Sequence, residues 1–386
     1  MLLTSLDSVD ISSNSWGPKI CTSTSISRGS RRRFLQECPF LTDNFDSPCE
    51  VCGNFVVSEE LSAECEEATA TYCLDHYEDD PIACAEYLDL FVDSCYYHML
   101  PTDIYSTFLQ TITEGRNGKG VLYVFAAGND YFLGVDINSD GYLNSRFTIG
   151  VAAVGKDGLH ASYSTTGAAV FVAAPGGDKE NLSNFLVAQA GGGCFDISYG
   201  SSFAAPVVSG VLALMLEVNP ELGWRDVQGI IASNSQLVDY EDVAWAVNAA
   251  GYAHSYKYGF GLIDASACVN ASRSWVNWGP EKQLMKDSAS INLQIVDDVN
   301  SLAESTLEVT KADVVAAMGS EGIFMESVMI YLDLSHSSRG DLSISLVSPQ
   351  GTTSELARPN RPENKQLSSD ERWKLMTLRN WGESPI

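Results

Sequence analysis

The sequence predicts an α/β domain built on a parallel sheet, followed by a second domain of antiparallel β structure. Two observations support this fold class. Short apolar runs of strand length alternate with helical segments between about residues 102 and 275, as in units that pack helices around a buried parallel sheet. After about Trp275, apolar and polar residues alternate with turn residues between the runs, which is typical of antiparallel strands.

The expected elements follow in chain order. "SVDISSNSWGP" predicts a short strand that ends in a polar turn at Ser15–Pro18, and an amphipathic helix from Asp103 ends among glycines near Gly115. Buried strands are predicted in "VLYVFAAGND", "RFTIGVAAV" and "AVFVAAPGG". A helix over Ser202–Val218 is apolar all round, so we expect it to be central, and "WRDVQGIIASNSQ" predicts a more amphipathic helix.

Composition limits the classes of partner. The 386 residues carry a formal net charge of -27, which argues against a nucleic-acid partner because phosphate binding needs clustered Lys and Arg. We find no continuous apolar run of about 18 residues, so we expect no membrane span. An acidic surface is compatible with cation binding or with basic substrates, but it establishes neither.

The cysteines are concentrated in one segment. Eight of the ten lie between Cys21 and Cys95, which predicts a disulfide-stabilised, acidic segment from Cys21 to about Pro101 and an oxidising compartment. The first residues, "MLLTSLDSVDISSNSWG", lack the basic and apolar regions of a secretory signal. We therefore expect the true N-terminus and its signal to lie upstream of Met1.

Two adjacent serines open the apolar helix, in "GSSFAAP". A serine in the first turn of a helix is placed where free backbone N–H groups and the helix dipole favour developing negative charge. Ser202 is therefore a candidate nucleophile, and the alternative is that Ser201 or Ser202 only caps a buried helix. The Gly-x-Ser-x-Gly pattern of a nucleophile elbow is absent from this stretch, because Ala204 stands where the last glycine would be.

Four separated motifs resemble the subtilisin-like serine proteases, and within them the kexin/furin-like proprotein convertases. "GSSFAAP" is similar to the serine motif of that family, "VFAAGND" to the strand that ends in the oxyanion-hole asparagine, and "SNSWGP" to the substrate-cleft strand. "RGDLSISLVSPQGT" and "WKLMTLRNWGESP" resemble the P domain, or Homo B domain, which follows convertase catalytic domains. The resemblance implies a subtilisin-like parallel sheet with flanking helices and a β-sandwich P domain.

The resemblance also implies roles for individual residues. Ser202 matches the nucleophile, and Asn129 matches the side chain that holds the oxyanion together with the Ser202 backbone N–H. Ser15, Trp16 and Gly17 match the strand that lines the cleft and pairs with the backbone of a protein or peptide substrate. The implied localisation is the secretory pathway or the extracellular space.

Selectivity for basic residues is implied by one matching carboxylate. Asp140, in "NSDGY", matches a convertase position that selects Arg or Lys, although an aspartate before glycine is also common in turns. The short acidic run that convertases carry after the cleft strand is replaced here by Lys19 and its neighbours. Calcium is expected of the intact family member, but Thr165 stands where convertases often carry a glutamate near a calcium site, and no metal ligand is identified.

The catalytic Asp and His of the family precede the cleft strand, and only twelve residues precede Ser13 here. Neither motif is present among them, so we expect a chain truncated at both ends that is inactive alone. The alternative is a catalytically dead, secreted binding or adhesion protein built from the P domain and the disulfide-rich insert. The expected domains are a cleft strand (1–18), the cysteine-rich insert (19–101), the rest of the catalytic domain (102–275) and a truncated P domain (285–386).

Overall fold

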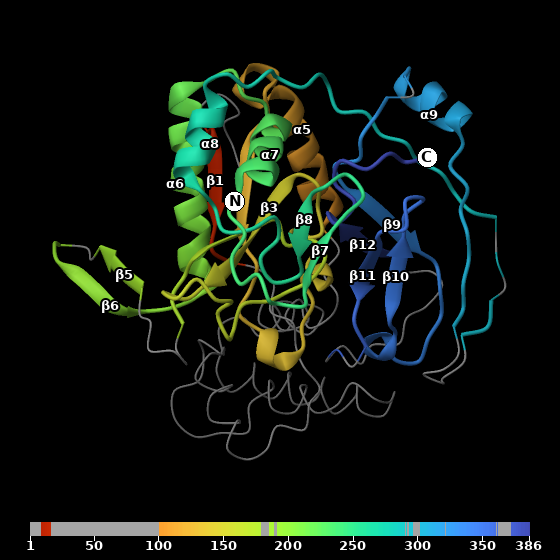
Figure 1. Cartoon of the computed structure of the whole chain (residues 1–386), viewed down its shortest axis with the longest axis horizontal. Helices are drawn as coiled ribbons and strands as arrows, with labels where there is room; N and C mark the ends of the chain where they lie inside the picture. Colours follow the sequence, from red (N-terminus) through yellow and green to blue (C-terminus); the bar gives the residue numbers. More distant parts are fainter. Residues whose placement is uncertain are drawn as a thin grey trace, which may run out of the picture.

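The computed structural model describes ten stretches of the chain, shown as coloured ribbon in Figure 1. They are residues 9–16, 100–178, 185–188, 191–289, 291, 293–295, 302–320, 322–359, 361 and 372–386. Gly17 and almost all of the predicted cysteine-rich insert lie outside the described residues.

A four-stranded parallel sheet forms the centre of the first domain. Its order is β1 (Ile11–Asn14), β2 (Leu122–Ala126), β3 (Thr148–Val154) and β4 (Val172–Pro175). Every residue of β2 and β3 is buried, as expected for strands that are covered on both faces. The predicted strands and their parallel arrangement are confirmed.

Helices cover the two faces of this sheet. α6 (Ser201–Val218) packs on all four strands and on α8 (Ala265–Ser272), and α5 (Thr102–Gly118) lies on the opposite side of β1 (Figure 1). α7 (Trp224–Asn234) contacts α8. The regular part of α5 ends at Gly115, where ψ is 150°, as the sequence predicted.

The prediction that the Ser202–Val218 helix is wholly central is wrong for one of its faces. Ala205, Val208 and Leu212 are fully buried, but Leu214 on the outer face is 55% exposed. The reason is that α6 is an outer layer of the α/β domain and meets the sheet along one side only. By length and composition alone, α6 could cross a membrane, but a packed core helix passes the same test.

The C-terminal region is mainly antiparallel β structure. β9 (Val328–Leu332) pairs with β12 (Trp373–Thr377), and β10 (Ile344–Val347) pairs with β11 (Thr353–Ala357). These strands lie together beside the parallel sheet, in blue in Figure 1. The region was expected to be all β, but it also contains α9 (Lys311–Met318).

Short elements complete the described part of the chain. They are η1 (Tyr131–Leu133), η2 (Ile137–Ser139), β5 (Phe185–Ala188), β6 (Cys194–Ser198), β7 (Trp245–Val247), β8 (Ala253–Ser255) and η3 (Arg339–Asp341).

An aromatic cluster joins the two regions. The Trp381 ring lies edge-on to Phe171, 5.8 Å between ring centroids, and to Phe260, at 5.3 Å. Trp381 is only 3% exposed. Edge-to-face rings at such distances stabilise a core beyond the area that they bury, so the end of the chain shares the core of the α/β domain.

Candidate active site

The backbone turn before Ser202 is held in a conformation that favours glycine. Gly200 has φ 148° and caps α6. Its N–H lies 2.7 Å from the hydroxyl of buried Tyr163, which in turn donates to the carbonyls of Gly176 and Gly177. This network fixes the point at which the helix begins and therefore the position of its first side chains.

Ser202 lies against the end of the first strand, although 187 residues separate it from Ser15. The Ser202 Oγ donates to the Ser15 carbonyl at 3.1 Å, and the Ser15 Oγ donates to the Ser202 carbonyl at 2.8 Å. The packing of α6 on β1 brings the two residues together. The two segments that the sequence placed around a cleft therefore meet at this point.

Asn129 follows β2 and faces the same helix start. Its Oδ1 accepts hydrogen bonds from the Ser201 backbone N–H, at 2.9 Å, and from the Ser201 Oγ, at 2.8 Å. Because both bonds use the amide oxygen, the amide orientation is defined and Nδ2 remains as the donor of this exposed side chain. Sequence reasoning considered Ser201 only as a helix cap, although its position next to Ser202 was a signal for this role.

Trp16 and Asp140 are connected through one residue, Tyr142, by its ring and its backbone N–H. The Tyr142 ring stacks on Phe125, 5.4 Å between centroids, and meets Trp16 edge-on at 5.4 Å. The Tyr142 backbone N–H donates to Asp140 Oδ1 at 2.8 Å. Trp16 is half exposed, whereas Asp140 is 7% exposed. Gly17, the remaining cleft residue expected from the sequence, lies outside the described residues.

Burial controls the protonation of Asp140. Removal from water raises the pKa of its carboxyl to about 7, against the opposing effect of hydrogen bonds from the backbone of Tyr142 and Leu143. The group is therefore partly protonated at neutral pH. A bound cation would favour its charged form, so this carboxyl can recognise a positive side chain at the cost of releasing a proton.

The described histidines are engaged away from the candidate nucleophile. His254 is fully buried, bonds through Nε2 to the Val170 carbonyl at 2.9 Å, and has its pKa lowered to about 3, mainly by burial. Burial and then Lys257 lower the pKa of His160 to about 4. His336 uses Nδ1 in contacts with Ser338. The other two histidines lie outside the described residues.

The acids near the site do not make a calcium cage. The described residues contain no group of three His, Cys, Asp or Glu side chains that could hold a metal ion. The Thr165 hydroxyl accepts from the Asp130 N–H at 3.2 Å, and Asp136 faces the Arg358 guanidinium at 3.6 Å. These residues do not fit the oxygen-rich coordination that calcium requires.

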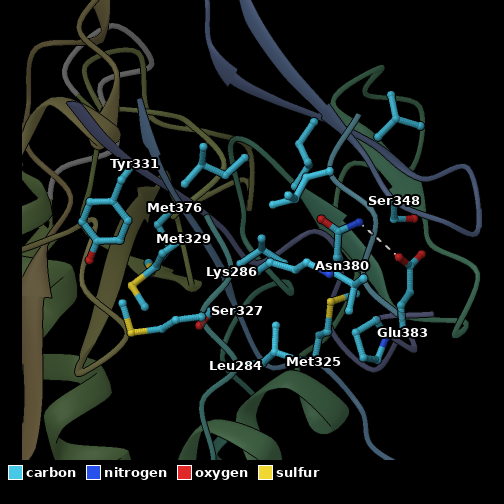
Figure 2. A pocket seen from close by; sticks show the side chains of 18 of the residues that line it. Leu284, Lys286, Met325, Ser327, Met329, Tyr331, Ser348, Met376, Asn380 and Glu383 are labelled. Atoms are coloured by element: carbon cyan, nitrogen blue, oxygen red, sulfur yellow. Dashed lines mark hydrogen bonds between the residues drawn. The ribbon is translucent and has the colours of Figure 1, made fainter. Parts of the chain in front are cut away.

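A large open groove lies elsewhere, in the C-terminal half of the molecule. Its lining includes Leu284, Lys286, Met325, Met329 and Met376 (Figure 2). None of the candidate site residues that the structure describes borders it. The groove is therefore separate from the chemistry at the start of α6.

Family models match most of the chain. The subtilase family model matches residues 4–261, and the proprotein convertase P-domain model matches residues 325–386.

Curated relatives show the same similarity. Protease KEX1 of Kluyveromyces lactis is 32% identical over 337 residues, which cover 87% of this chain and 43% of the relative. PC3-like endoprotease variant B of Hydra vulgaris is 36% identical over 277 residues, covering 70% and 38%. Furin-1 of Xenopus laevis is 31% identical over 278 residues, covering 72% and 34%. The chain thus spans less than half the length of these relatives.

Among solved structures, the serine protease of Aeromonas sobria superposes with a TM-score of 0.62 at 22% identity. The match covers 75% of this chain and 60% of that protease. At this level of identity the similarity shows a shared fold.

Proposed function

The chain belongs to the subtilase family of serine peptidases, and from this premise we propose that it supplies the nucleophile and oxyanion hole of a subtilisin/kexin-type endopeptidase. The observation that carries the proposal is the meeting of Asn129, Ser201 and Ser202 at the start of α6, beside Ser15. A convertase P domain follows the catalytic region, which supports the kexin/furin branch of the family.

The proposed chemistry starts with attack by Ser202 on the scissile carbonyl. The negative oxygen that forms is held by the Asn129 Nδ2 and by the Ser202 backbone N–H. Ser201 fixes the Asn129 amide in the orientation that leaves Nδ2 free to donate. Loss of one oxyanion donor typically costs about 2.7–4 kcal/mol in the transition state.

The proposed substrate is a protein or peptide with a basic residue before the scissile bond. Its backbone pairs with the strand end at Ser15 and Trp16, which adds one strand to the edge of the site. The carboxylate of Asp140 attracts the basic side chain. Kexin- and furin-like relatives and the cysteine-rich insert support the secretory pathway or the extracellular space as the location.

We expect this chain by itself to be inactive. A serine hydroxyl becomes a competent nucleophile only when a base removes its proton. Here the Ser202 hydroxyl donates to a backbone carbonyl, and the described histidines are bonded elsewhere. The catalytic Asp and His of the family precede the cleft strand, so a segment that carries both residues is needed to complete this chemistry.

A chimera tests this function. The segment of Kluyveromyces protease KEX1 that precedes the matching cleft strand would be fused to this chain, and cleavage of fluorogenic peptides ending in Arg or in Ala would be compared. We expect cleavage after Arg by the chimera and none by the chain alone. S202A should abolish the activity and N129A should reduce it at least about 100-fold. S209A, two turns further along α6, is the matched control and should retain it.

Each outcome tests a different part of the proposed function. Cleavage that survives S202A would refute the assignment of the nucleophile, and turnover by the unfused chain would refute its predicted inactivity. Equal cleavage after Arg and Ala would refute basic selectivity while leaving the peptidase assignment intact. A folded chimera without any activity would favour the catalytically dead binding protein.

A further inference from the structure

The Asp140 segment is attached to the C-terminal strands by a buried side chain. Asn138 lies two residues before Asp140, in η2, and is 2% exposed. Its Nδ2 donates to the Leu356 carbonyl of β11 at 2.9 Å and to the Met376 carbonyl of β12 at 3.1 Å. Its Oδ1 accepts from the Met376 N–H at 2.8 Å. A single amide thus bonds to backbone groups of two strands more than 200 residues away.

Neighbouring residues strengthen the same attachment. Asn144 is fully buried, and its Nδ2 donates to the Asn138 carbonyl at 2.9 Å and to the Lys374 carbonyl of β12 at 3.2 Å. Asp136 and Arg358 form an ion pair across the same boundary, at 3.6 Å. Contacts with β11 and β12 therefore occur on both sides of Asp140 in the sequence.

The local bonds of this segment centre on Asp140. Its carbonyl accepts from the N–H groups of Leu143 and Asn144, and its Oδ1 accepts from the Tyr142 N–H. Tyr142 in turn packs on Trp16. Asn138, by contrast, directs its side chain away from these bonds and onto β11 and β12, so it links the position of Asp140 to the C-terminal strands.

We infer that Asn138 is a positioning residue through which the C-terminal β strands hold Asp140 at the substrate site. The role in substrate binding depends on the proposed function of Asp140, whereas the mechanical link does not. When the Asn138 bonds are lost, fewer contacts attach the 136–144 segment to β11 and β12, and the Asp140 carboxyl is held less firmly at the site.

The test uses the 386-residue chain with N138D and a matched control. The aspartate keeps the Oδ1 acceptor for the Met376 N–H but turns the Nδ2 donor into an oxygen that faces two carbonyls. The control is N248D. Asn248 is 6% exposed and donates to the Arg379 and Trp381 carbonyls, at 3.0 and 2.7 Å, so it also bonds the C-terminal region but lies outside the Asp140 segment.

Hydrogen exchange measures the link directly. We expect the amides of residues 136–144 to exchange at least about tenfold faster in N138D than in wild type, and to change less than about twofold in N248D. Equal exchange of this segment in the two variants would overturn the inference. If N138D does not fold, N144A serves instead: it removes the bonds to the Lys374 and Asn138 carbonyls but keeps the side-chain bonds of Asn138. It must raise exchange in residues 136–144 more than N248D does, or the inference fails.

Binding of benzamidine, an arylamidinium that mimics an arginine side chain, tests the connection to substrate. We expect at least about tenfold weaker binding in N138D and less than twofold change in N248D. Faster exchange together with unchanged benzamidine binding would overturn the positioning role. Faster exchange in a chain that does not bind benzamidine even as wild type would support the link and refute the proposed function of Asp140.

Discussion

The parallel sheet and the C-terminal strands differ in how they are stabilised. In the sheet β1–β4, all residues of β2 and β3 are buried, and helices pack on the strands. In the C-terminal region the strands form two-stranded pairs, and intermediate and exposed residues alternate along β10. A two-stranded pair alone is marginally stable in water, so these strands need further contacts.

Those contacts are polar as well as apolar. Side-chain amides of the first domain bond to backbone groups of β11, β12 and the segment after them, through Asn138, Asn144 and Asn248. In the opposite direction, Arg379 donates to carbonyls of the first domain. Burial of apolar side chains therefore stabilises the parallel sheet. The C-terminal strands depend in addition on hydrogen bonds, and loss of these bonds leaves buried polar groups unsatisfied.

The largest expected effect is a difference in unfolding free energy between substitutions of two valines, one in each region. Val151 in β3 is fully buried and Val347 in β10 is 61% exposed. V151D places a charge in the core and should lower the free energy of unfolding by about 4 kcal/mol or more. V347D should change it by less than about 0.5 kcal/mol. Urea denaturation followed by circular dichroism measures both, and similar losses would contradict the contrast.

A smaller effect is expected at Arg379. It is 6% exposed, its Nη2 donates to the carbonyls of Ala244, at 2.6 Å, and His254, at 3.2 Å, and its guanidinium stacks on Tyr256 at 4.0 Å. R379A leaves the buried His254 carbonyl and the partly buried Ala244 carbonyl without this donor and should cost about 2–3 kcal/mol.

Hydrogen exchange would show which strands are destabilised by R379A. We expect faster exchange in β12 and little change in β2 and β3. R273A, at an exposed arginine at the end of α8, is the control and should change stability by less than about 0.5 kcal/mol. Faster exchange in both regions to the same extent would show that they unfold as one unit.

A gradual, pH-dependent effect on stability is expected at Asp140, whose segment joins the two regions. Its pKa is raised from 3.8 to about 7 by burial, so the folded state binds more protons than the unfolded state between these values. Stability should therefore fall as pH rises from about 4 to about 7, by about 1.4 kcal/mol for each pH unit in the middle of that range. It should be independent of this group at higher and lower pH.

The variant D140N removes this contribution but keeps an oxygen that can accept from the Tyr142 N–H. The difference in unfolding free energy between D140N and wild type should therefore grow in favour of D140N from pH 4 to pH 7. Parallel stability curves across this interval would show that the buried carboxyl does not titrate there.

Much of the fold followed from local pattern. The strands β2, β3 and β4 were predicted because wholly apolar runs of strand length occur in parallel sheets that are covered on both faces. The end of regular helix at Gly115 followed from the glycines. The exposed face of α6 was missed because composition reports how apolar a helix is but not which neighbours cover it. α9 was also missed, because the region that contains it was predicted to be all β from its alternation of apolar and polar residues.

The candidate site was predicted in part. Ser202, Asn129, Ser15 and Trp16 were selected from motifs, and the structure brings Ser202 beside Ser15 and Asn129 beside Ser201. Their roles remain proposals. Asn138 could not be selected, because its partners lie more than 200 residues away and are backbone groups, which carry no signal in the sequence.

The sequence by itself determined the fold class, the family and the residue types at the start of α6, because periodicity, glycine positions and short motifs are local properties. Only the tertiary structure decided which side chains meet. Asp140 illustrates the difference: its identity was visible in "NSDGY", but its raised pKa and its attachment to β11 and β12 through Asn138 arise from burial and from contacts between distant segments. Burial and long-range hydrogen bonds exist only once the chain has folded.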